Sequence, residues 1–240
     1  MIEISQISKV YSKKVKAVDN LSLIIPDGKI VGFIGPNGAG KTTTLKMMTG
    51  ILHPDTGTVK LNGFDIVEQP LQAKQQFGFV ADNPDVFLRL KGIEYLNLMA
   101  DIYGVDSQTR QDRIIELATK FEMVNALNDK ILSYSHGMRQ KIVIIGVLLH
   151  QPSIWILDEP LTGLDPQSSF ILKEMMSQHA KANNTVFFST HVLEVAERLC
   201  DIVIIINRGH ILFEGTLESL KQQYPNQTLE NIFLEVTNHE

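Results

Sequence analysis

The apolar positions of this chain follow two different periods, and the change between them separates a β-rich frame from a helical insertion. Before residue 92 and after residue 150, short apolar runs separated by Gly, Pro, Asn and Asp predict β-strands with helices between them. From 92 to 149, apolar residues recur at helical spacing with no good strand pattern, which predicts a block of helices. The third helix of this block is expected to begin near Ser135, whose hydroxyl can cap it.

Strands alternate with helices along the frame, an order that predicts an α/β fold with a mainly parallel sheet. The run Ile154-Trp155-Ile156-Leu157 is apolar throughout, as expected for a strand inside a sheet that is covered on both faces. The tail beyond Thr216 is expected to be helical at first and then weakly ordered. Strands are expected at 2–7, 17–25, 30–34, 58–63, 77–81, 154–157, 185–188, 201–206 and 211–214, and helices of the frame at 43–48, 165–179 and 192–199.

The segment Gly35-Pro36-Asn37-Gly38-Ala39-Gly40-Lys41-Thr42, followed by Thr43, is the most informative stretch of the sequence. It has the spacing G-x-x-x-x-G-K-[ST] of a phosphate-binding loop, and it lies between a predicted strand and a predicted helix, as this motif requires. Its glycines allow successive N–H groups to turn inward around a phosphate, and the helix N-terminus adds its positive end. Lys41 would reach the β- and γ-phosphates, and the Thr42 hydroxyl would hold Mg²⁺. The alternative is a glycine-rich turn without a ligand; the lysine and threonine favour nucleoside triphosphate binding.

Two acidic residues follow the apolar strand at 154–157. Asp158 ends the strand, where an open α/β sheet places its ligand-binding groups, so its carboxylate can hold Mg²⁺ together with Thr42. Glu159 points differently as the chain leaves the strand, and it can accept a proton from the attacking water. Without the phosphate loop, surface acids after a strand would be the better interpretation of this pair.

His191 and Tyr11 each allow two interpretations from position alone. His191 follows the strand at 185–188, so it is either a group that reaches a γ-phosphate or a packed polar residue. Tyr11 lies between the first two strands, where it would either stack on a purine or be a half-buried edge residue.

Composition limits the remaining classes of function. With 27 acidic and 22 basic residues the net charge is −5, which does not indicate a basic surface that would bind nucleic acid. The lysines at 9, 13, 14 and 16 are interpreted as a solvent-exposed face. A single cysteine, Cys200, excludes an internal disulfide. The N-terminus lacks the pattern of a signal peptide, and the longest apolar runs, at 142–149 and 202–206, fall short of the ~20 residues that span a bilayer. A cytoplasmic protein is expected.

Together, these segments resemble the ATPase subunit of an ATP-binding-cassette (ABC) transporter, over Tyr11 to about Gly215 and in that family's order. The most specific stretch is Leu157-Asp158-Glu159-Pro160-Leu161-Thr162-Gly163-Leu164-Asp165-Pro166. The resemblance implies one ABC ATPase domain over 1–240. Its parts would be a P-loop NTPase core at 1–91 and 150–215 that includes an N-terminal antiparallel β subdomain, an inserted helical subdomain at 92–149, and a C-terminal helix and tail at 216–240.

The resemblance also implies roles for single residues. Tyr11 would stack on the adenine of ATP, Glu159 would polarise the attacking water, and His191 would contact the γ-phosphate. Asp165 would lie at the interface between two subunits.

The chain departs from the family's pattern in two places. The signature Leu-Ser-Gly-Gly-Gln becomes Tyr134-Ser135-His136-Gly137-Met138, yet the Ser135 hydroxyl and the Gly137 N–H remain at a helix N-terminus, where the resemblance implies contact with the γ-phosphate of a partner subunit. Read alone, Ser-x-Gly is an ordinary helix cap. Asp82 stands where the family usually has Gln. Because aspartate is shorter than glutamine and anionic, it would act on Mg²⁺ through a water, or its loop would lie closer to the metal.

The expected function is hydrolysis of MgATP to ADP and phosphate, which powers a separate transmembrane permease through ATP-driven head-to-tail dimerisation. The signature variant resembles bacterial exporters more than importers. The expected partners are the permease and a second ABC ATPase subunit, identical or different, and the expected place is the cytoplasmic face of the membrane. One alternative is a soluble mechanical ATPase built on the same cassette, although the long heptad insertion or second cassette of such proteins is missing from the sequence. The other alternative is a kinase or a GTPase. The Asn-Lys-x-Asp motif that reads guanine in GTPases does not occur in the sequence.

Overall fold

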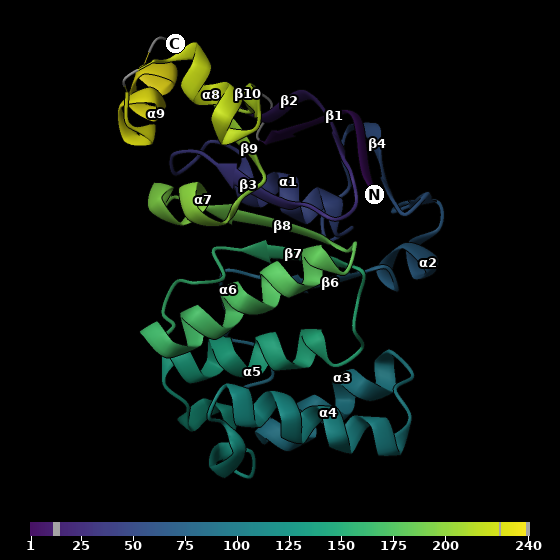
Figure 1. Ribbon diagram of the computed structural model, residues 1–240. Coiled ribbons are helices and arrows are strands. Elements are labelled where there is room, and N and C mark those ends of the chain that lie inside the picture. Colours follow the sequence, from purple (N-terminus) through teal and green to yellow (C-terminus); the bar gives the residue numbers. More distant parts are fainter. Residues whose placement is uncertain (12–14, 226, 239–240) are drawn as a thin grey trace.

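The computed structural model describes residues 1–11, 15–225 and 227–238, which fold into two β-sheets with helices around them (Figure 1). Of the basic cluster near the N-terminus, Lys13 and Lys14 lie outside the described residues. Lys9 and Lys16 are each paired with an aspartate, at N···O distances of 2.6 and 2.8 Å. Neighbouring carboxylates therefore neutralise the described part of this cluster.

The N-terminal sheet is antiparallel, with the strand order β2-β1-β4-β5. Ile2, Ile4 and Ile7 of the first strand are buried, although Ile7 follows Ile4 by three residues instead of two. Gln6 has a φ of 50° and the register with β2 shifts between Ile4 and Ile7, so a bulge returns Ile7 to the buried face. The strands are β1 (Ile2–Tyr11), β2 (Val15–Ile25), β4 (Thr56–Leu61) and β5 (Phe64–Asp65).

The central sheet has the strand order β10-β9-β3-β8-β7-β6. Strands β9 to β6 in this order are parallel, and β10 pairs antiparallel with β9 at one edge, which confirms the predicted mainly parallel α/β sheet. Every residue of β3, β7 and β8 is buried, as the apolar run at 154–157 predicts for β7. The strands are β3 (Ile30–Ile34), β6 (Phe77–Val80), β7 (Ile154–Asp158), β8 (Thr185–Thr190), β9 (Ile202–Asn207) and β10 (His210–Gly215).

Helices cover both faces of the central sheet. Helix α1 (Lys41–Met48) shares a core with the N-terminal sheet and with Val31 and Phe33 of β3. On the opposite face, α6 (Pro166–Lys181) packs on Val186 and Phe188 of β8, and α7 (Leu193–Leu199) packs near β3. Side chains at alternate positions along the strands thus point to opposite faces of the sheet and pack into different cores, one on each face.

The predicted helical block consists of α3 (Gly92–Ile102), α4 (Ser107–Lys120) and α5 (His136–Leu148), with short 3-10 turns at 124–126 and 131–133. Helix α5 begins at the predicted cap, since the Ser135 hydroxyl accepts from the Met138 N–H at 3.3 Å. Every residue from Gln140 to Leu148 is buried, because α5 lies between the sheet and the other two helices (Figure 1).

Three features differ from the prediction or were not expected from the sequence. Strand β5 and α2 (Pro70–Lys74) were not expected. The chain after Thr216 forms α8 (Leu217–Gln223) and α9 (Leu229–Asn238), so the prediction of a weakly ordered end is wrong for the described residues. Leu229 and Ile232 of α9 are buried against α7 and α8, a contact that local sequence does not encode. Within the described ranges, no helix is long and apolar enough to cross a membrane.

Candidate functional site

The predicted phosphate loop joins β3 to α1 and is shaped by its glycines. Gly38 and Gly40 have φ values of 81° and 109°, in the region that residues with a Cβ resist. A Cβ at Gly40 would also lie 2.4 Å from the carbonyl oxygen of Ala17. Helix α1 begins directly after Gly40, so its free N–H groups face the loop.

Lys41 is buried in this loop, with only 7% of its surface exposed. Its Nζ donates to the carbonyl oxygens of Gly35 at 2.7 Å and Pro36 at 3.3 Å. Burial lowers the pKa of Lys41, while the nearby carboxylates of Glu159 and Asp158 act in the opposite direction. The ammonium group therefore lies among acceptors and within electrostatic reach of both predicted acids.

A hollow of about 360 Å³ opens over the loop. Tyr11, Asp82 and Glu159 line it from three separate parts of the chain, and Tyr11 is 43% exposed. Its other lining residues are Ala17, Pro36, Asn37, Gly38, Gly40, Lys41, Thr42 and Thr43. The fold thus gathers Tyr11, Asp82, Glu159 and most of the predicted phosphate loop around one cavity, whereas Asp158 and His191 are not among its lining residues. Gly35 and Ala39 are buried beneath them.

The two predicted acids are held differently at the end of β7. Asp158 is 1% exposed and accepts at 2.5 Å from the Ser189 hydroxyl, which in turn accepts from the Glu159 N–H at 3.0 Å. Glu159 has a φ of 49°, so the chain turns sharply there and its side chain leaves the strand direction. Its carboxylate lies 3.0 Å from Nδ1 of His191. The sequence did not point to Ser189, although it follows the apolar run at 186–188 as Asp158 follows the run at 154–157.

Ser135, Gly137 and Asp165 do not line this hollow. They lie at the N-terminal ends of α5 and α6, where a Cβ on Gly137 would be 2.6 Å from the carbonyl oxygen of Gly163. Asp165 caps α6, because its carboxylate accepts from the Ser168 N–H at 2.8 Å, and it lies 2.7 Å from Nζ of Lys141. The contact with Lys141, and after it the bond from the Ser168 N–H, hold the pKa of Asp165 well below its ordinary value. The sequence did not point to Lys141.

Asp82 follows β6 and is exposed at the rim of the hollow. Three residues later, Asp85 lies 2.7 Å from a guanidinium nitrogen of Arg139 on α5. The same Arg139 donates to the carbonyl oxygen of Leu132 at 2.9 Å. An ion pair therefore joins the loop after β6 to the first turn of α5.

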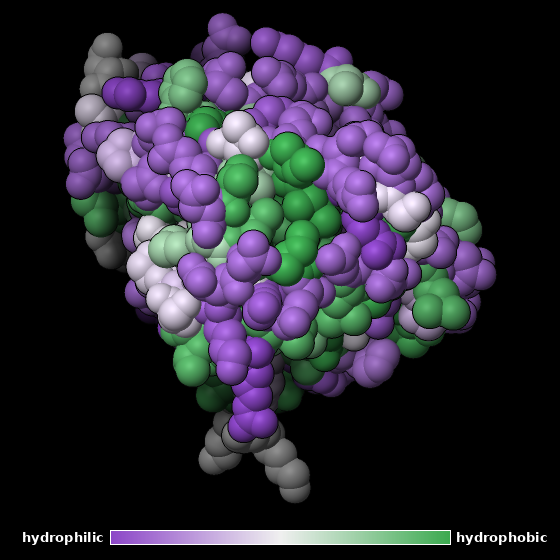
Figure 2. All heavy atoms as spheres, turned by 90° about the horizontal axis from the view of Figure 1, so that it is seen from below, coloured by the Kyte–Doolittle hydropathy of each residue, from purple (hydrophilic) through white to green (hydrophobic). Residues whose placement is uncertain are grey.

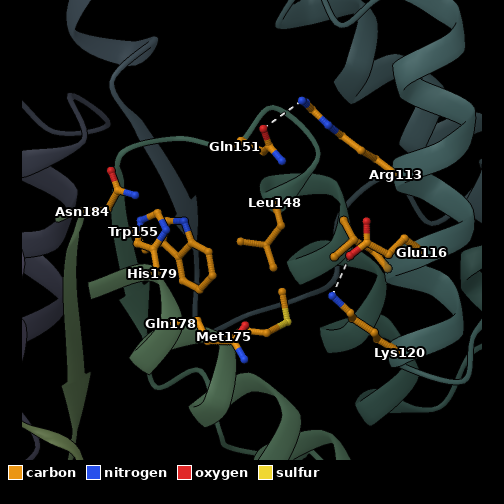
Figure 3. Close-up of a pocket in the computed structure, with 11 residues that line it drawn as sticks. Arg113, Glu116, Lys120, Leu148, Gln151, Trp155, Met175, Gln178, His179 and Asn184 are labelled. Atoms are coloured by element: carbon orange, nitrogen blue, oxygen red, sulfur yellow. Dashed lines mark hydrogen bonds and ion pairs between the residues drawn. The ribbon is translucent and has the colours of Figure 1, made fainter. Parts of the chain in front are cut away.

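A second hollow, of about 440 Å³, lies where β7 begins, at the end of the strand opposite to Asp158 (Figure 3). Trp155 and His179 stack on one side of it, with ring centroids 4.1 Å apart, and Arg113 on the other side is bonded to Gln151 at 2.8 Å. Burial lowers the pKa of His179 to about 4. None of the predicted site residues lines this hollow, so it is not part of the candidate site.

Comparison with known proteins decides the family. The sequence profile of the ABC transporter family matches residues 18–162, more than half of the chain. The chain belongs to the ABC transporter family. Its relatives include the ABC transporter ATP-binding protein NatA of Bacillus subtilis, with 38% identity over 98% of this chain and 97% of NatA. The daunorubicin/doxorubicin resistance ATP-binding protein DrrA of Streptomyces peucetius is 34% identical over 95% of this chain and 69% of DrrA.

Solved structures agree with this assignment. The structure of an ATP-binding subunit of an ABC transporter has a TM-score of 0.93 at 30% identity, and the match covers 98% of this chain and 99% of that one. A dimeric ATP-binding cassette in a post-hydrolysis state, bound to ADP and Pi, shares the fold with a TM-score of 0.82 at 23% identity, over 90% of this chain and 99% of that one. This chain is an ABC ATPase: it binds ATP with Mg²⁺ and hydrolyses ATP as the nucleotide-binding part of a transporter.

Proposed function

We propose that the hollow over the phosphate loop is the ATP site, and that hydrolysis there drives a separate transmembrane permease through a dimer of ATPase subunits. The observation that carries this proposal is the convergence of Lys41, Asp158, Glu159 and His191 at the edge of the sheet where β3, β7 and β8 end. Four charged or ionisable groups at one edge, next to a loop of free N–H groups, fit a phosphate-transfer site.

Binding of the nucleotide would use the backbone first. The N–H groups of the loop and of the first turn of α1 would hold the phosphates, and the Lys41 ammonium would leave its carbonyl acceptors for the β- and γ-phosphates. Tyr11, exposed on the rim, would stack on the adenine. The Thr42 hydroxyl and Asp158 would hold Mg²⁺, which supplies positive charge against the phosphate oxygens. Asp82 on the rim would act through a water.

Hydrolysis would depend on Glu159. Its carboxylate would take a proton from the water that attacks the γ-phosphorus, as the bond to the ADP oxygen breaks. His191 lies 3.0 Å from this carboxylate and would fix its orientation while facing the γ-phosphate. The side chain of Glu159 is 14% exposed, so little bulk water competes for its oxygens.

A second subunit would complete the site. Ser135 and Gly137 lie at the start of α5, away from their own hollow, with the Ser135 side chain exposed. A head-to-tail pair of subunits would bring them to the partner's γ-phosphate, and Asp165 would lie in the same interface. A cassette of the same fold has been solved as a dimer, which supports the pairing of two subunits.

The permease would dock on the helical side of the molecule. Seen from the end that carries the helical block, apolar side chains gather in one area surrounded by polar ones (Figure 2). Phe87, in the loop that connects the rim of the hollow to α3, is 51% exposed. Such a loop can pass changes at the nucleotide to a bound partner. The drug-resistance name of DrrA favours export as the direction, with this chain on the cytoplasmic face of the membrane.

Replacing one acid tests the site directly. Glu159→Gln should bind MgATP like wild type and lose at least about 100-fold of the hydrolysis rate, because the amide cannot accept the proton. Glu194→Gln, at an exposed glutamate early in α7, is the control and should hydrolyse ATP normally. Hydrolysis at the wild-type rate by purified Glu159→Gln would refute the role of this carboxylate.

A further inference from the structure

Ser189 is the buried residue that connects the two predicted acids. It lies next to last in β8, is 0% exposed, and pairs in register with Asp158 on the neighbouring strand β7. Its hydroxyl donates to Oδ1 of Asp158 at 2.5 Å and accepts from the N–H of Glu159 at 3.0 Å. One hydroxyl therefore contacts both the side chain of one acid and the backbone of the next.

The contact to Asp158 fixes the rotation of its carboxylate. A carboxylate at the end of a strand can turn about its terminal bond, whereas a hydrogen bond to one oxygen leaves the other oxygen in a defined direction. Groups that orient a metal ligand in this way usually change metal affinity or activity when they are removed. Because Asp158 is 1% exposed, solvent has little access to replace the missing donor.

The contact to Glu159 fixes the backbone at the turn. Glu159 has a φ of 49°, a conformation that residues other than glycine and asparagine seldom adopt without support. The Ser189 oxygen accepts the N–H of this residue and so satisfies a backbone donor at the turn. This conformation directs the Glu159 carboxylate to within 3.0 Å of His191, which lies two residues beyond Ser189 on the same chain segment.

We propose that Ser189 is a positioning residue of the ATPase reaction, whose hydroxyl holds the metal-binding Asp158 and the base Glu159 in one fixed arrangement. This inference rests on the roles proposed above for those two acids. Ser189 touches neither of the reacting atoms in this proposal; it acts through its two hydrogen bonds. Its hydroxyl therefore affects turnover and the requirement for Mg²⁺, and leaves the phosphate loop itself unchanged.

Two variants with side chains of nearly the same shape separate the hydroxyl from the packing. Ser189→Thr keeps a hydroxyl and Ser189→Val replaces it by a methyl group, while both add the same bulk to the strand. Ser189→Ala, which adds no volume, gives the same comparison against wild type. Thr185→Val is the matched control: Thr185 is a buried hydroxyl at the other end of β8 and donates to Asp27 at 3.2 Å, away from the site.

The rate of ATP hydrolysis is measured as a function of ATP and of Mg²⁺, and binding of a fluorescent ATP analogue is measured in EDTA. Ser189→Val and Ser189→Ala should lower kcat by about 10- to 100-fold and raise the Mg²⁺ concentration for half-maximal rate. Analogue binding in EDTA should stay as in wild type, and Ser189→Thr should recover most of the rate. Thr185→Val should keep the wild-type rate and Mg²⁺ requirement.

Equal rates for Ser189→Thr and Ser189→Val, together with wild-type behaviour of Ser189→Ala, would overturn the positioning role. Equal losses in the Thr and Val variants with an active Ala variant would also overturn it, because they would assign the effect to bulk. The result for Glu159→Gln keeps this failure distinct from failure of the proposed function. An inactive Glu159→Gln with a normal Ser189→Ala contradicts the role of Ser189 alone, whereas an active Glu159→Gln contradicts the assignment of the base itself.

Discussion

The Glu159 carboxylate lies 3.0 Å from Nδ1 of His191, and the two residues follow neighbouring parallel strands, β7 and β8. The pairing of these strands places the two chain ends side by side, and the turn at Glu159 directs its side chain across the gap. The histidine is the more accessible member of the pair, with 57% of its side chain exposed against 14% for the glutamate. The pair is therefore a half-buried acid covered by an exposed imidazole.

His191→Ala should reduce ATP hydrolysis by about 10-fold or more, because the carboxylate loses the group that orients it and the γ-phosphate loses a contact. Binding of MgATP should change little, since the phosphate loop supplies most of the contacts. Steady-state kinetics check this as a fall in kcat with a nearly constant KM. A variant that keeps the full wild-type kcat would place His191 among the packed polar residues instead.

Lys41→Ala should weaken nucleotide binding itself, by about 10-fold or more, because it removes the positive charge next to the phosphates. Lys46→Ala, at an exposed lysine in the last turn of the same helix, is the matched control. Titration with a fluorescent ATP analogue distinguishes the two. Equal affinities for the Lys41 and Lys46 variants would show that the phosphates bind elsewhere.

Phe87→Asp should release the subunit from the membranes of cells that also make its permease, while the purified variant still hydrolyses ATP. The exposed ring lies in the loop between the hollow and α3, and a buried carboxylate in an apolar contact is unfavourable. Ile24→Asp, which changes an exposed apolar residue on β2 of the N-terminal sheet, is the control and should stay with the membrane fraction. If wild type is never found with membranes, the soluble mechanical ATPase becomes the better account.

Two half-buried histidines should make the fold less stable in mild acid. Burial lowers the pKa of His150 and of His179 to about 4, and the ordinary value is 6.5. Between these values the unfolded chain binds more protons, so the free energy of unfolding falls as the pH is lowered from 6.5 to 4.

Denaturant titration at pH 7 and pH 5 measures this effect. His150→Gln should show a smaller loss of stability between the two pH values than wild type, because one of the two low-pKa groups is gone. His53→Gln, at an exposed histidine, should keep the wild-type difference. The same pH dependence in all three proteins would assign the acid sensitivity to other groups.

The parts of the site that the sequence predicted are those encoded by neighbouring residues. The phosphate loop from Gly35 to Thr42 requires its glycines and lysine at fixed spacing, and an apolar strand followed by Asp158 marks the carboxyl end of a buried strand. These signals need no knowledge of the rest of the chain. The helical block is equally local, because its 3.6-residue period is repeated over several turns.

The residues that were not predicted depend on contacts between distant segments. Ser189 and Lys141 gain their partners from β7 and from the cap of α6, and no spacing in the sequence relates them. The burial of Leu229 in α9 depends on α7 and α8, which explains why the end of the chain was predicted to be weakly ordered. Asp82 lies exposed on the rim of the hollow, which is why we propose that it acts on Mg²⁺ through a water.

ATP-dependent dimerisation is the most direct test, since it requires both the ATP site of one subunit and the N-terminal ends of α5 and α6 of the other. The Glu159→Gln variant is used because it should not hydrolyse the ATP that holds the dimer together. Light scattering of Glu159→Gln should show a monomer without nucleotide and a dimer with MgATP. Adding Gly137→Asp should abolish the dimer, because a carboxylate would face the partner's γ-phosphate, while monomer binding of ATP remains. Since a Cβ at Gly137 would also crowd the Gly163 carbonyl oxygen, Ser135→Ala, which adds no bulk, is tested beside it and should weaken the dimer as well. Dimers that form in MgATP despite Gly137→Asp, or Glu159→Gln that stays monomeric with ATP bound, would contradict the account.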